Sequence, residues 1–404
     1  MAGKSRLGSL SILTLMHVVT DGYAVFVPAL WIPLKETFGL TAVGTGVVIM
    51  VGLIPANLLQ PVFGLLCDRY ESKWMVVLGP LVAVVLLSLL GLSNWLWLTL
   101  AMLFLANAGV ALFHPEAATM AGRFAAAGSP RTMSLFLAGG FIGQAIGPTF
   151  ISWAIAEDLG RTFADSWITI FPGLVVMAIG AVMVLMLPKS HHPPRPQQRA
   201  SFAQLLRGRH RAIWALVATN TTRFFGLNMI LLTLPEYMND LGLGQLDVGI
   251  WMTAFIWAQG ATMFIGASIT PAHRERSLLI GSLAATLIPA WIFPFVDNWA
   301  ALIVLMFIGA NIAWTIPVVV RLGQEIVPDG QRLISGMMIG LTWGMAILVA
   351  PPLVGYLCEA HSPKASFIVG AAALIAPLCS ALLLPSQSRL DELKGRAPHG
   401  AAQT

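Results

Sequence analysis

Long apolar runs separated by short polar segments follow one another along the whole chain. Each run contains about twenty mainly apolar residues, which is the length of helix that crosses the hydrocarbon core of a bilayer. The pattern predicts an all-α polytopic membrane protein with about twelve transmembrane helices. These helices are expected to begin near Ser9, Thr41, Trp74, Trp97, Met133, Trp167, Ala212, Leu246, Leu278, Trp299, Ile334 and Ala365.

The composition supports this class and excludes a water-soluble globule. Of the 404 residues, 57% are hydrophobic and 10% are charged, whereas an ordinary soluble domain has roughly 25% charged residues. The three cysteines, Cys67, Cys358 and Cys379, are an odd number without metal-ligand spacing. The sequence therefore predicts no disulfide framework, no metal site and no cofactor.

The basic residues are distributed unevenly between the predicted loops. If the N-terminus is cytoplasmic, nineteen of the 23 Lys and Arg lie on that side, and only Lys35, Arg161 and Lys364 lie in loops on the other side. Cytoplasmic loops of membrane proteins carry an excess of Lys and Arg. The distribution predicts that both termini are cytoplasmic in a bacterial inner membrane, and it accounts for the net charge of +5 without a nucleic-acid partner.

One long, proline-rich and basic connection divides the predicted helices into two sets of six. We expect an N-terminal six-helix bundle over residues 1–188, a basic cytoplasmic linker over 189–211 and a C-terminal six-helix bundle over 212–385. The polar and charged residues 386–404 predict a disordered cytoplasmic tail.

An internal repeat with an offset of 202 residues supports this division. Each matching pair falls at the same place in the corresponding helix of the other half, as expected for two parallel repeats related by an axis along the membrane normal. The matches are Pro33 with Pro235, Gly64 with Gly266, Trp97 with Trp299 and Pro115 with Pro317.

Few ionisable side chains lie inside the predicted helices, and Asp21 is near the middle of the first one. An ionisable residue within a span costs roughly 2.5 to 3.5 kcal/mol on insertion scales, so each is a functional candidate. His17 lies one turn before Asp21 on the same helix face. We expect the two side chains to exchange a proton near neutral pH on a face that lines water. The alternative is an Asp21 held permanently in a structural ion pair.

The offset of 202 places Arg223 at the position that corresponds to Asp21. Opposite charges at matching depth would pair when the two halves close, and protonation of Asp21 or an anionic substrate at Arg223 would release them. The alternative is an Arg223 whose side chain reaches the membrane interface or meets backbone carbonyls.

The segment Phe113 to Glu116 combines an imidazole, a helix-breaking proline and a carboxylate. The proline frees a backbone carbonyl, which gives the polar groups a local partner. We expect His114 and Glu116 to take part in proton coupling along the translocation path. The alternative is a structural role for Glu116 near the cytoplasmic end.

Polar and aromatic residues near the middle of other predicted helices are candidates for a substrate cavity. The same residue types also form hydrogen bonds between transmembrane helices, so no single one identifies a site. Glycines four apart, such as Gly139, Gly143 and Gly147, predict close packing of helices. The cavity candidates are Gln144, Asn220, Arg223, Asn228, Trp257, Gln259, Asn311 and Trp343.

The connection after the second predicted helix resembles the G-x-x-x-D-R/K-x-G-R-R/K signature of the major facilitator superfamily. The matching residues are Gly64, Asp68, Arg69 and Lys73, and the two residues before Lys73 depart from the signature. The resemblance implies a gating role for these four residues at the cytoplasmic ends of helices. It also implies two six-helix bundles, a monomer in the lipid bilayer and a small-molecule substrate.

Within that superfamily, the first half of the chain resembles the fosmidomycin-resistance-like branch of exporters. The resemblance implies a proton-coupled efflux pump for a small, drug-like or anionic organic compound, which agrees with a coupling role for Asp21 and Glu116. The residues that are similar to its hallmarks are His17, Asp21, Gln60, Pro61, Val62, Gly64, Phe113, His114, Pro115, Glu116, Gly139, Gly140, Gly147 and Pro148.

The sequence thus predicts a secondary active transporter that exports its substrate by proton-coupled alternating access. The chain has no P-loop motif, which argues against ATP as the direct energy source. The alternative is an uptake symporter for a small organic acid or metal chelate, because the sequence does not encode the direction of transport. An intramembrane enzyme that uses His114 and Glu116 would lack a nucleophile or metal motif, so no enzymatic activity is predicted.

Overall fold

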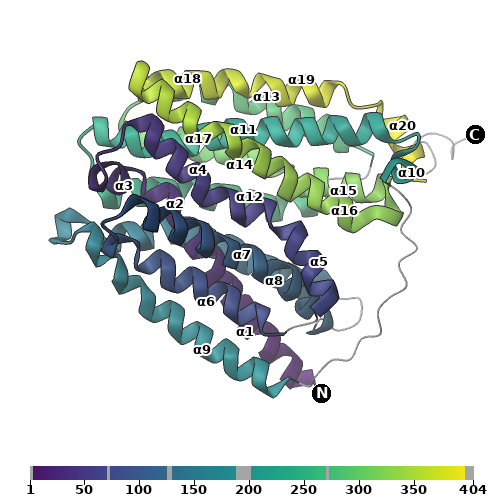
Figure 1. The fold of residues 1–404 in the computed structure, drawn as a ribbon. Coiled ribbons are helices and arrows are strands. Elements are labelled where there is room, and N and C mark those ends of the chain that lie inside the picture. The colour runs from purple at the N-terminus through teal and green to yellow at the C-terminus, as the bar shows by residue number, and fades with distance from the viewer. Residues whose placement is uncertain (1–2, 71–72, 125–129, 188–201, 270–272, 396–404) are drawn as a thin grey trace, which may run out of the picture. The chain divides into compact units, whose positions relative to one another are not determined.

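The structure, a computed structural model, describes residues 3–70, 73–124, 130–187, 202–269 and 273–395. In these parts of the chain every regular element is a helix and no strand occurs (Figure 1). The predicted all-α class is therefore confirmed.

Nine segments of the described chain are long and apolar enough to cross a membrane. Three other predicted spans correspond to the shorter apolar helix α6 and to the long helices α11 and α12, so the count of twelve stays a prediction. The nine segments are Gly8–Ala29, Ala42–Gly64, Leu96–Gly122, Leu135–Ala154, Phe163–Met186, Glu275–Phe295, Asn298–Ile326, Leu333–Ala360 and Pro363–Leu382.

Prolines and short turns divide several predicted spans into two helices. A π-helical turn, Met337–Leu341, interrupts one of them. The helices are α1 (Gly3–Ala24), α2 (Phe26–Ala29), α3 (Trp31–Thr37), α4 (Ala42–Leu58), α5 (Gln60–Tyr70), α6 (Met75–Ser88), α7 (Leu96–Phe124), α8 (Pro130–Ala154), α9 (Ile170–Met186), α10 (Phe202–Leu206), α11 (His210–Asp240), α12 (Gln245–Ile269), α13 (Glu275–Ile292), α14 (Asn298–Ala313), α15 (Ile316–Ile326), α16 (Gln331–Gly336), α17 (Thr342–Ala360), α18 (Pro363–Ala373), α19 (Ile375–Leu382) and α20 (Gln387–Leu393).

Contacts divide the chain into two compact units. Unit 1 contains Met1–Pro188 together with two segments of the second half of the chain, Leu231–Trp257 and Ile347–Ser366. Unit 2 contains the remainder, which is Lys189–Ile230, Ala258–Ala346 and Phe367–Thr404. The predicted boundary after residue 188 coincides with one break between the units, and the division into two six-helix bundles stays a prediction.

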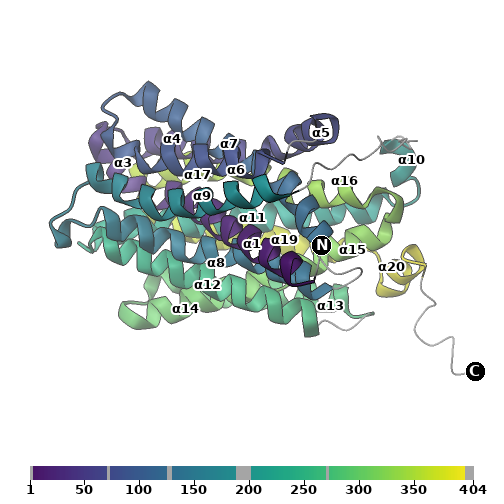
Figure 2. The same ribbon diagram turned by 90° about the horizontal axis from the view of Figure 1, so that it is seen from below.

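In unit 1, α1 packs along α8 and α9, as Figures 1 and 2 show. Glycine permits the close approach of α1 and α8, because a Cβ on Gly143 would lie 2.0 Å from the carbonyl oxygen of Val18. The close helix packing that the glycines predict is thus present between α1 and α8. It brings the face of α1 that carries Asp21 against α8.

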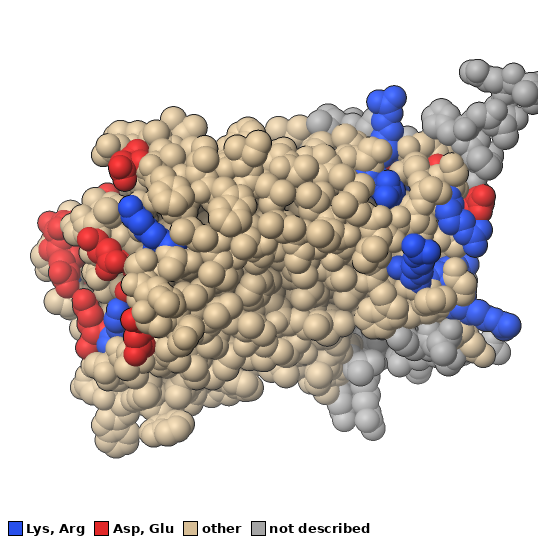
Figure 3. Space-filling model, turned by 90° about the horizontal axis from the view of Figure 1, so that it is seen from above, with Lys and Arg blue, Asp and Glu red and all other residues tan. Residues whose placement is uncertain are grey.

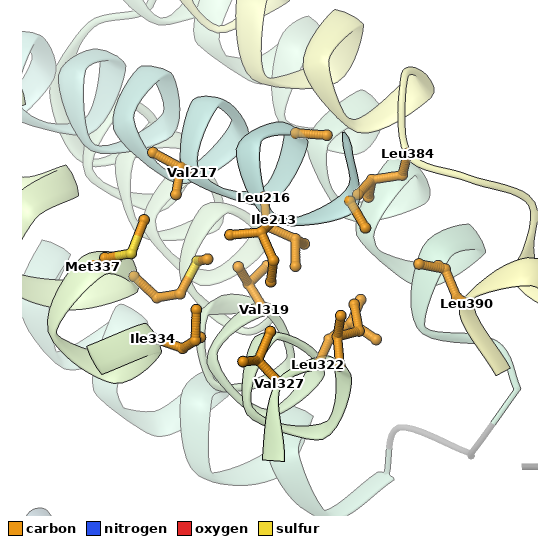
Figure 4. Close-up of a cluster of buried hydrophobic side chains, with 14 of the residues drawn as sticks. Ile213, Leu216, Val217, Val319, Leu322, Val327, Ile334, Met337, Leu384 and Leu390 are labelled. Atoms are coloured by element: carbon orange, nitrogen blue, oxygen red, sulfur yellow. The ribbon is translucent and has the colours of Figure 1, made fainter. Parts of the chain in front are cut away.

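In unit 2, a cluster of buried apolar side chains joins the start of α11 to α15, α16 and α20 (Figure 4). Ile213, Val319, Ile334 and Leu390 are each fully buried in it. Burial of apolar side chains away from water is a main favourable term in packing helices together. The cluster therefore fixes α20 against the body of unit 2.

The predicted disordered tail from residue 386 is wrong for α20. Ser386 caps this helix by accepting a hydrogen bond from the Arg389 backbone N–H, and Leu390 and Asp391 are buried. Sequence composition missed the helix because its few buried residues are spaced among charged ones. Residues 189–201 of the predicted linker and 396–404 of the tail lie outside the described residues.

Charged side chains lie mainly toward the ends of the helices. On the face shown in Figure 3, other residues cover the middle parts of the helices, and the described Lys, Arg, Asp and Glu lie near the helix ends. This distribution matches the apolar length of the nine candidate spans and fits a lipid environment for the middle parts.

We expect the stability of unit 2 to depend on the ionisation of Asp391 at acid pH. Burial opposes ionisation of this carboxyl, but hydrogen bonds from Lys394, His273 and Gln387 outweigh it and lower its pKa to about 2, compared with about 3.9 in an unfolded chain. The stabilisation is therefore complete above about pH 4 and is lost as the pH falls toward 2.

Thermal unfolding of the purified protein between pH 2 and 6 checks this. Asp391→Asn should unfold several degrees below the wild type at pH 6, and the difference should shrink toward pH 2. A difference that does not change with pH would contradict the assignment.

Candidate functional site

Three helices of unit 1 bring together four polar side chains, one of which is Asp21. His17 and Asp21 come from α1, His114 from α7 and Gln144 from α8. Asp21 Oδ1 lies 3.1 Å from His114 Nε2, and Asp21 Oδ2 lies 3.5 Å from His17 Nε2. The Gln144 amide donates to Asp21 Oδ2 at 2.9 Å. The structure therefore brings together three of the four predicted proton-coupling residues and one cavity candidate.

The two imidazole rings are held in one tautomer by backbone carbonyls. His17 Nδ1 lies 2.8 Å from the Phe136 carbonyl oxygen, and His114 Nδ1 lies 2.8 Å from the Val110 carbonyl oxygen. A carbonyl oxygen only accepts, so both Nδ1 atoms must carry a hydrogen. The His17 ring also stacks on the Phe136 ring, with centroids 4.3 Å apart.

This tautomer leaves both Nε2 atoms directed at one carboxylate. A neutral imidazole with a hydrogen on Nδ1 has only a lone pair on Nε2, and a carboxylate has only acceptors. The short contact between Asp21 and His114 is favourable only with a proton between them, either on Asp21 or on His114. The group therefore holds at least one proton beyond the two on the Nδ1 atoms, and it can pass that proton between carboxylate and imidazole.

Access to the group is unequal. The side chains of His17 and Asp21 are 6% and 8% exposed, whereas that of His114 is 26% exposed. Behind Asp21, a Cβ on Gly140 would lie 2.7 Å from both Asp21 Oδ2 and His17 Nε2. Backbone of α8 thus closes one side, and His114 is the most exposed of the three side chains.

The same donor atoms would suit a divalent transition metal ion, which accepts imidazole nitrogen and carboxylate oxygen. Within the described part of the chain, only His17, Asp21 and His114 form such a group, with ligand atoms within 4.8 Å of one another. Sequence spacing did not indicate this group, because His114 is distant from the other two residues along the chain.

Glu116 lies apart from His114 on α7. Residues two apart in a helix do not face each other, and Glu116 is buried, with 7% of the residue exposed. Its coupling role stays a prediction.

The predicted gating residues are only partly described. Lys73 donates to the carbonyl oxygen of Leu187 at the end of α9, and Gly64 has open space around its Cβ position. Asp68 and Arg69 belong to α5 by their backbone, but their side chains lie outside the described residues. Their gating role stays a prediction.

In unit 2, Arg223 lies fully buried among neutral groups. Its Nη1 donates to Thr315 Oγ1 at 2.9 Å and its Nη2 donates to Asn220 Oδ1. Asn220 in turn donates to the Met338 carbonyl, which belongs to the π-helical turn. Within the described chain, Arg223 Nε has no hydrogen-bond partner. The predicted alternative in which Arg223 reaches the membrane interface does not apply to this buried side chain.

The other cavity candidates divide into three groups. Trp343 packs against Phe224 next to Arg223, with ring centroids 4.5 Å apart. The amides of Asn228 and Asn311 instead donate to the carbonyls four residues earlier in their own helices, an arrangement that satisfies a polar side chain within an apolar helix. Trp257 is 46% exposed and Gln259 is partly buried. Their roles in substrate binding stay predictions.

The sequence did not predict a second polar group in unit 1. Lys35 Nζ lies 2.7 and 2.9 Å from the two carboxylate oxygens of Glu236, and the Trp31 indole donates to Glu236 at 2.8 Å. Lys35 appeared to be an ordinary loop residue. The offset of 202 contained a signal, since Pro33 matches Pro235 and charged residues follow both prolines.

Fold and site define a class of protein: an all-helical, multi-pass membrane protein whose ionisable residues form polar groups within its helices. The sequence profile of the Major Facilitator Superfamily matches residues 12–244 and 216–401. The chain belongs to the Major Facilitator Superfamily. It is a membrane transporter of small molecules and not an enzyme.

Individual relatives agree with this assignment. The chain is 23% identical over 355 residues to the fosmidomycin resistance protein of Escherichia coli (strain K12), covering 87% of this chain and 86% of the relative. It is 26% identical over 399 residues to the uncharacterized MFS-type transporter YfnC of Bacillus subtilis (strain 168), covering 95% and 94%. The solved structure of the nucleoside transporter NupG superposes with a TM-score of 0.71 at 15% identity, covering 94% of this chain and 99% of that one. The predicted resemblance to the superfamily, close to the fosmidomycin-resistance branch, is confirmed.

Gly140→Ala tests the packing of α8 against the polar group. The added methyl would overlap Asp21 and His17, and overpacking of this kind costs about 1–3 kcal/mol. We expect thermal unfolding in detergent to occur roughly 2–10 °C lower. Gly281→Ala in α13 is the control, because its Cβ position is open and alanine favours a helix. Equal stability of both variants would show that α8 does not approach Asp21 as described.

Lys35 and Glu236 generate a second prediction. Lys35→Met leaves the buried Glu236 carboxylate with the Trp31 N–H as its remaining hydrogen-bond donor. We expect the free energy of unfolding to fall by at most about 3 kcal/mol, because the lysine side chain is 30% exposed and solvent weakens the ion pair. Adding Glu236→Gln should restore part of the stability because it removes the unpaired charge. Thermal unfolding measures both variants, with the exposed Lys364→Met as control. A double variant less stable than Lys35→Met would contradict the pairing.

Proposed function

We propose that this protein exports a small, drug-like or anionic organic compound in exchange for protons, by alternating access of its substrate site to the two sides of the membrane. The observation that carries this proposal is the 3.1 Å distance between Asp21 Oδ1 and His114 Nε2, from which we infer a shared proton. The protein would act as a monomer in a bacterial inner membrane, with both termini in the cytoplasm.

A coupling site must bind and release a proton within one transport cycle. In the Asp21 group the proton has two alternative positions a short distance apart, and both imidazoles already have their Nδ1 atoms satisfied by backbone carbonyls. Loss of the proton would leave the carboxylate oxygens of Asp21 facing the Nε2 lone pairs of the imidazoles, and neither kind of atom can donate a hydrogen bond. The protonated group is therefore compact, and a deprotonated group must separate its members or admit water. This link between charge and conformation supports proton coupling.

The environment of Arg223 supports an anionic substrate. A guanidinium buried without a carboxylate is costly, and an anion that reaches it gains strongly in a medium of low dielectric. Arg223 has neutral partners and an Nε–H without a hydrogen-bond partner in the described chain. We infer that Arg223 and Asn220 bind the acidic group of the substrate and that Trp343 contacts its apolar part.

Uptake by a symporter remains the second candidate. The same proton site would serve a symporter for a small organic acid or metal chelate, because neither the Asp21 group nor Arg223 determines the direction of net flux. The transport test below therefore measures both directions.

The test compares wild type with Asp21→Asn in proteoliposomes that carry a pH gradient. Asparagine keeps the size of the side chain and can still donate to a neutral His114 Nε2, so the fold should persist. We expect proton-driven transport to fall at least about 100-fold, the scale of a lost proton-transfer group. Exchange of substrate without net flux should persist. The control is the exposed Glu157→Gln, which should transport normally.

Fosmidomycin and a panel of small organic anions are the probes. Outward transport that acidifies the compartment the substrate leaves supports export by antiport. Accumulation together with protons favours the symporter. Proton-driven transport that is unchanged in Asp21→Asn would overturn the coupling site in either case.

A further inference from the structure

Three charged side chains form a buried network at one end of unit 2. Lys394 Nζ lies 2.9 Å from Glu275 Oε1 and 2.9 Å from Asp391 Oδ1, and the side chains of all three residues are only 1% exposed. Glu275 begins α13, whereas Asp391 and Lys394 belong to α20 and its C-terminal cap. The network thus joins two segments that are more than one hundred residues apart along the chain.

Neighbouring polar groups complete this network. The Gln387 amide donates to Glu275 Oε2 at 2.9 Å and to Asp391 Oδ1 at 3.1 Å, and His273 Nδ1 lies 2.8 Å from Asp391 Oδ2. Arg276 donates to the carbonyls of Leu382 and Leu384 at the end of α19. The helix dipole stabilises a cation at this end of a helix. The start of α13 is therefore tied to α20 and to the end of α19.

The ion-pair network is not the only set of contacts that holds α20 in unit 2. Leu390 already holds the helix in the apolar cluster of Figure 4. Burying an ion pair is often no more stabilising than burying apolar residues of similar size, but breaking one is costly because a buried charge is left without its partner. A network of this kind gives a defined geometry between α13 and α20, which apolar contact alone does not.

The internal repeat shows a corresponding tie in the first half. The offset of 202 relates Lys73 to Glu275. Lys73 lies at the start of the third predicted span and donates to the Leu187 carbonyl at the end of α9, the last helix of its half before the predicted linker. Glu275 lies at the start of the ninth predicted span and binds the segment that follows α19. In each half, a residue at the start of the third predicted span thus contacts either the end of the last span or the segment that follows it.

We propose that α20 is a latch that makes the start of α13 and the end of α19 move as one body during transport. The proposal rests on the transporter family of the chain and not on the identity of its substrate or coupling ion. In this role α20 holds the start of α13 through an ion-pair network. In the first half, the end of α9 holds Lys73 through a hydrogen bond. The latch is formed by Glu275, Asp391 and Lys394, with His273, Arg276 and Gln387 around them.

Hydrogen exchange of the purified full-length protein tests the latch. Lys394→Met leaves two buried carboxylates without their cation, so we expect exchange in residues 275–283 and 387–393 to be at least about tenfold faster. Exchange in α1, α7 and α8 of unit 1 should not change. The control is Glu392→Gln on the same helix, which removes only the exposed pair with Arg389.

A second variant separates the latch from a general loss of folding. Lys394→Met with Glu275→Gln removes the cation and one of the carboxylates, so it should fold better than Lys394→Met while still lacking the ion pair. We expect faster exchange at the start of α13 in this variant too. In proteoliposomes its maximal transport rate should fall at least about threefold with an unchanged half-saturating concentration, since the network does not touch the proposed substrate residues.

Two results would overturn the proposal. One is exchange at residues 275–283 that is as slow in the double variant as in the wild type. The other is faster exchange together with wild-type transport, which would make the network a structural support only. Failure to find proton coupling or an exported compound would leave the exchange result standing, so the latch and the proposed function can fail separately.

Discussion

A charge buried in a transmembrane helix must be neutralised by a proton or a partner, because the lipid interior offers neither water nor counterions. Asp21 meets this constraint with two imidazoles and an amide from three helices. The backbone carbonyls of Phe136 and Val110 determine the tautomer of the imidazoles, so the group is satisfied only while it holds an additional proton. Charge state and helix packing are thereby linked at one place, and the proposed coupling mechanism depends on that link.

Arg223 meets this constraint only in part, although the repeat relates it to Asp21. Its partners are the neutral side chains of Asn220 and Thr315, and the π-helical turn supplies a carbonyl that orients Asn220. Neutral dipoles orient a guanidinium without cancelling its charge. The two halves of the chain therefore carry side chains of opposite charge, Asp21 and Arg223, at matching positions of the repeat. In the proposed mechanism the first half holds a proton, and the second half carries a positive charge that an anionic substrate would complement. Their direct pairing stays a prediction.

Sequence patterns predicted the features that depend on neighbours along the chain. Apolar runs of span length gave the all-helical class, and the spacing of four residues placed His17 beside Asp21. Features that depend on tertiary contacts were out of reach. The approach of His114 to Asp21 depends on how α7 packs, and the buried pair of Lys35 and Glu236 joins segments about two hundred residues apart. The tail was predicted wrongly because composition does not show that Leu390 finds an apolar cluster.

The most direct test of the account is a count of the protons on the histidine rings. Solid-state nitrogen NMR of the protein in lipid, with ¹⁵N-labelled histidine, distinguishes the protonation states of Nδ1 and Nε2. The account predicts that His17 and His114 both carry a hydrogen on Nδ1 and that the state of His114 Nε2 changes when Asp21→Asn removes the carboxylate. His273, which contacts Asp391 in unit 2, should not change. A His114 with its hydrogen on Nε2 alone, or one that does not respond to Asp21→Asn, would contradict the shared proton.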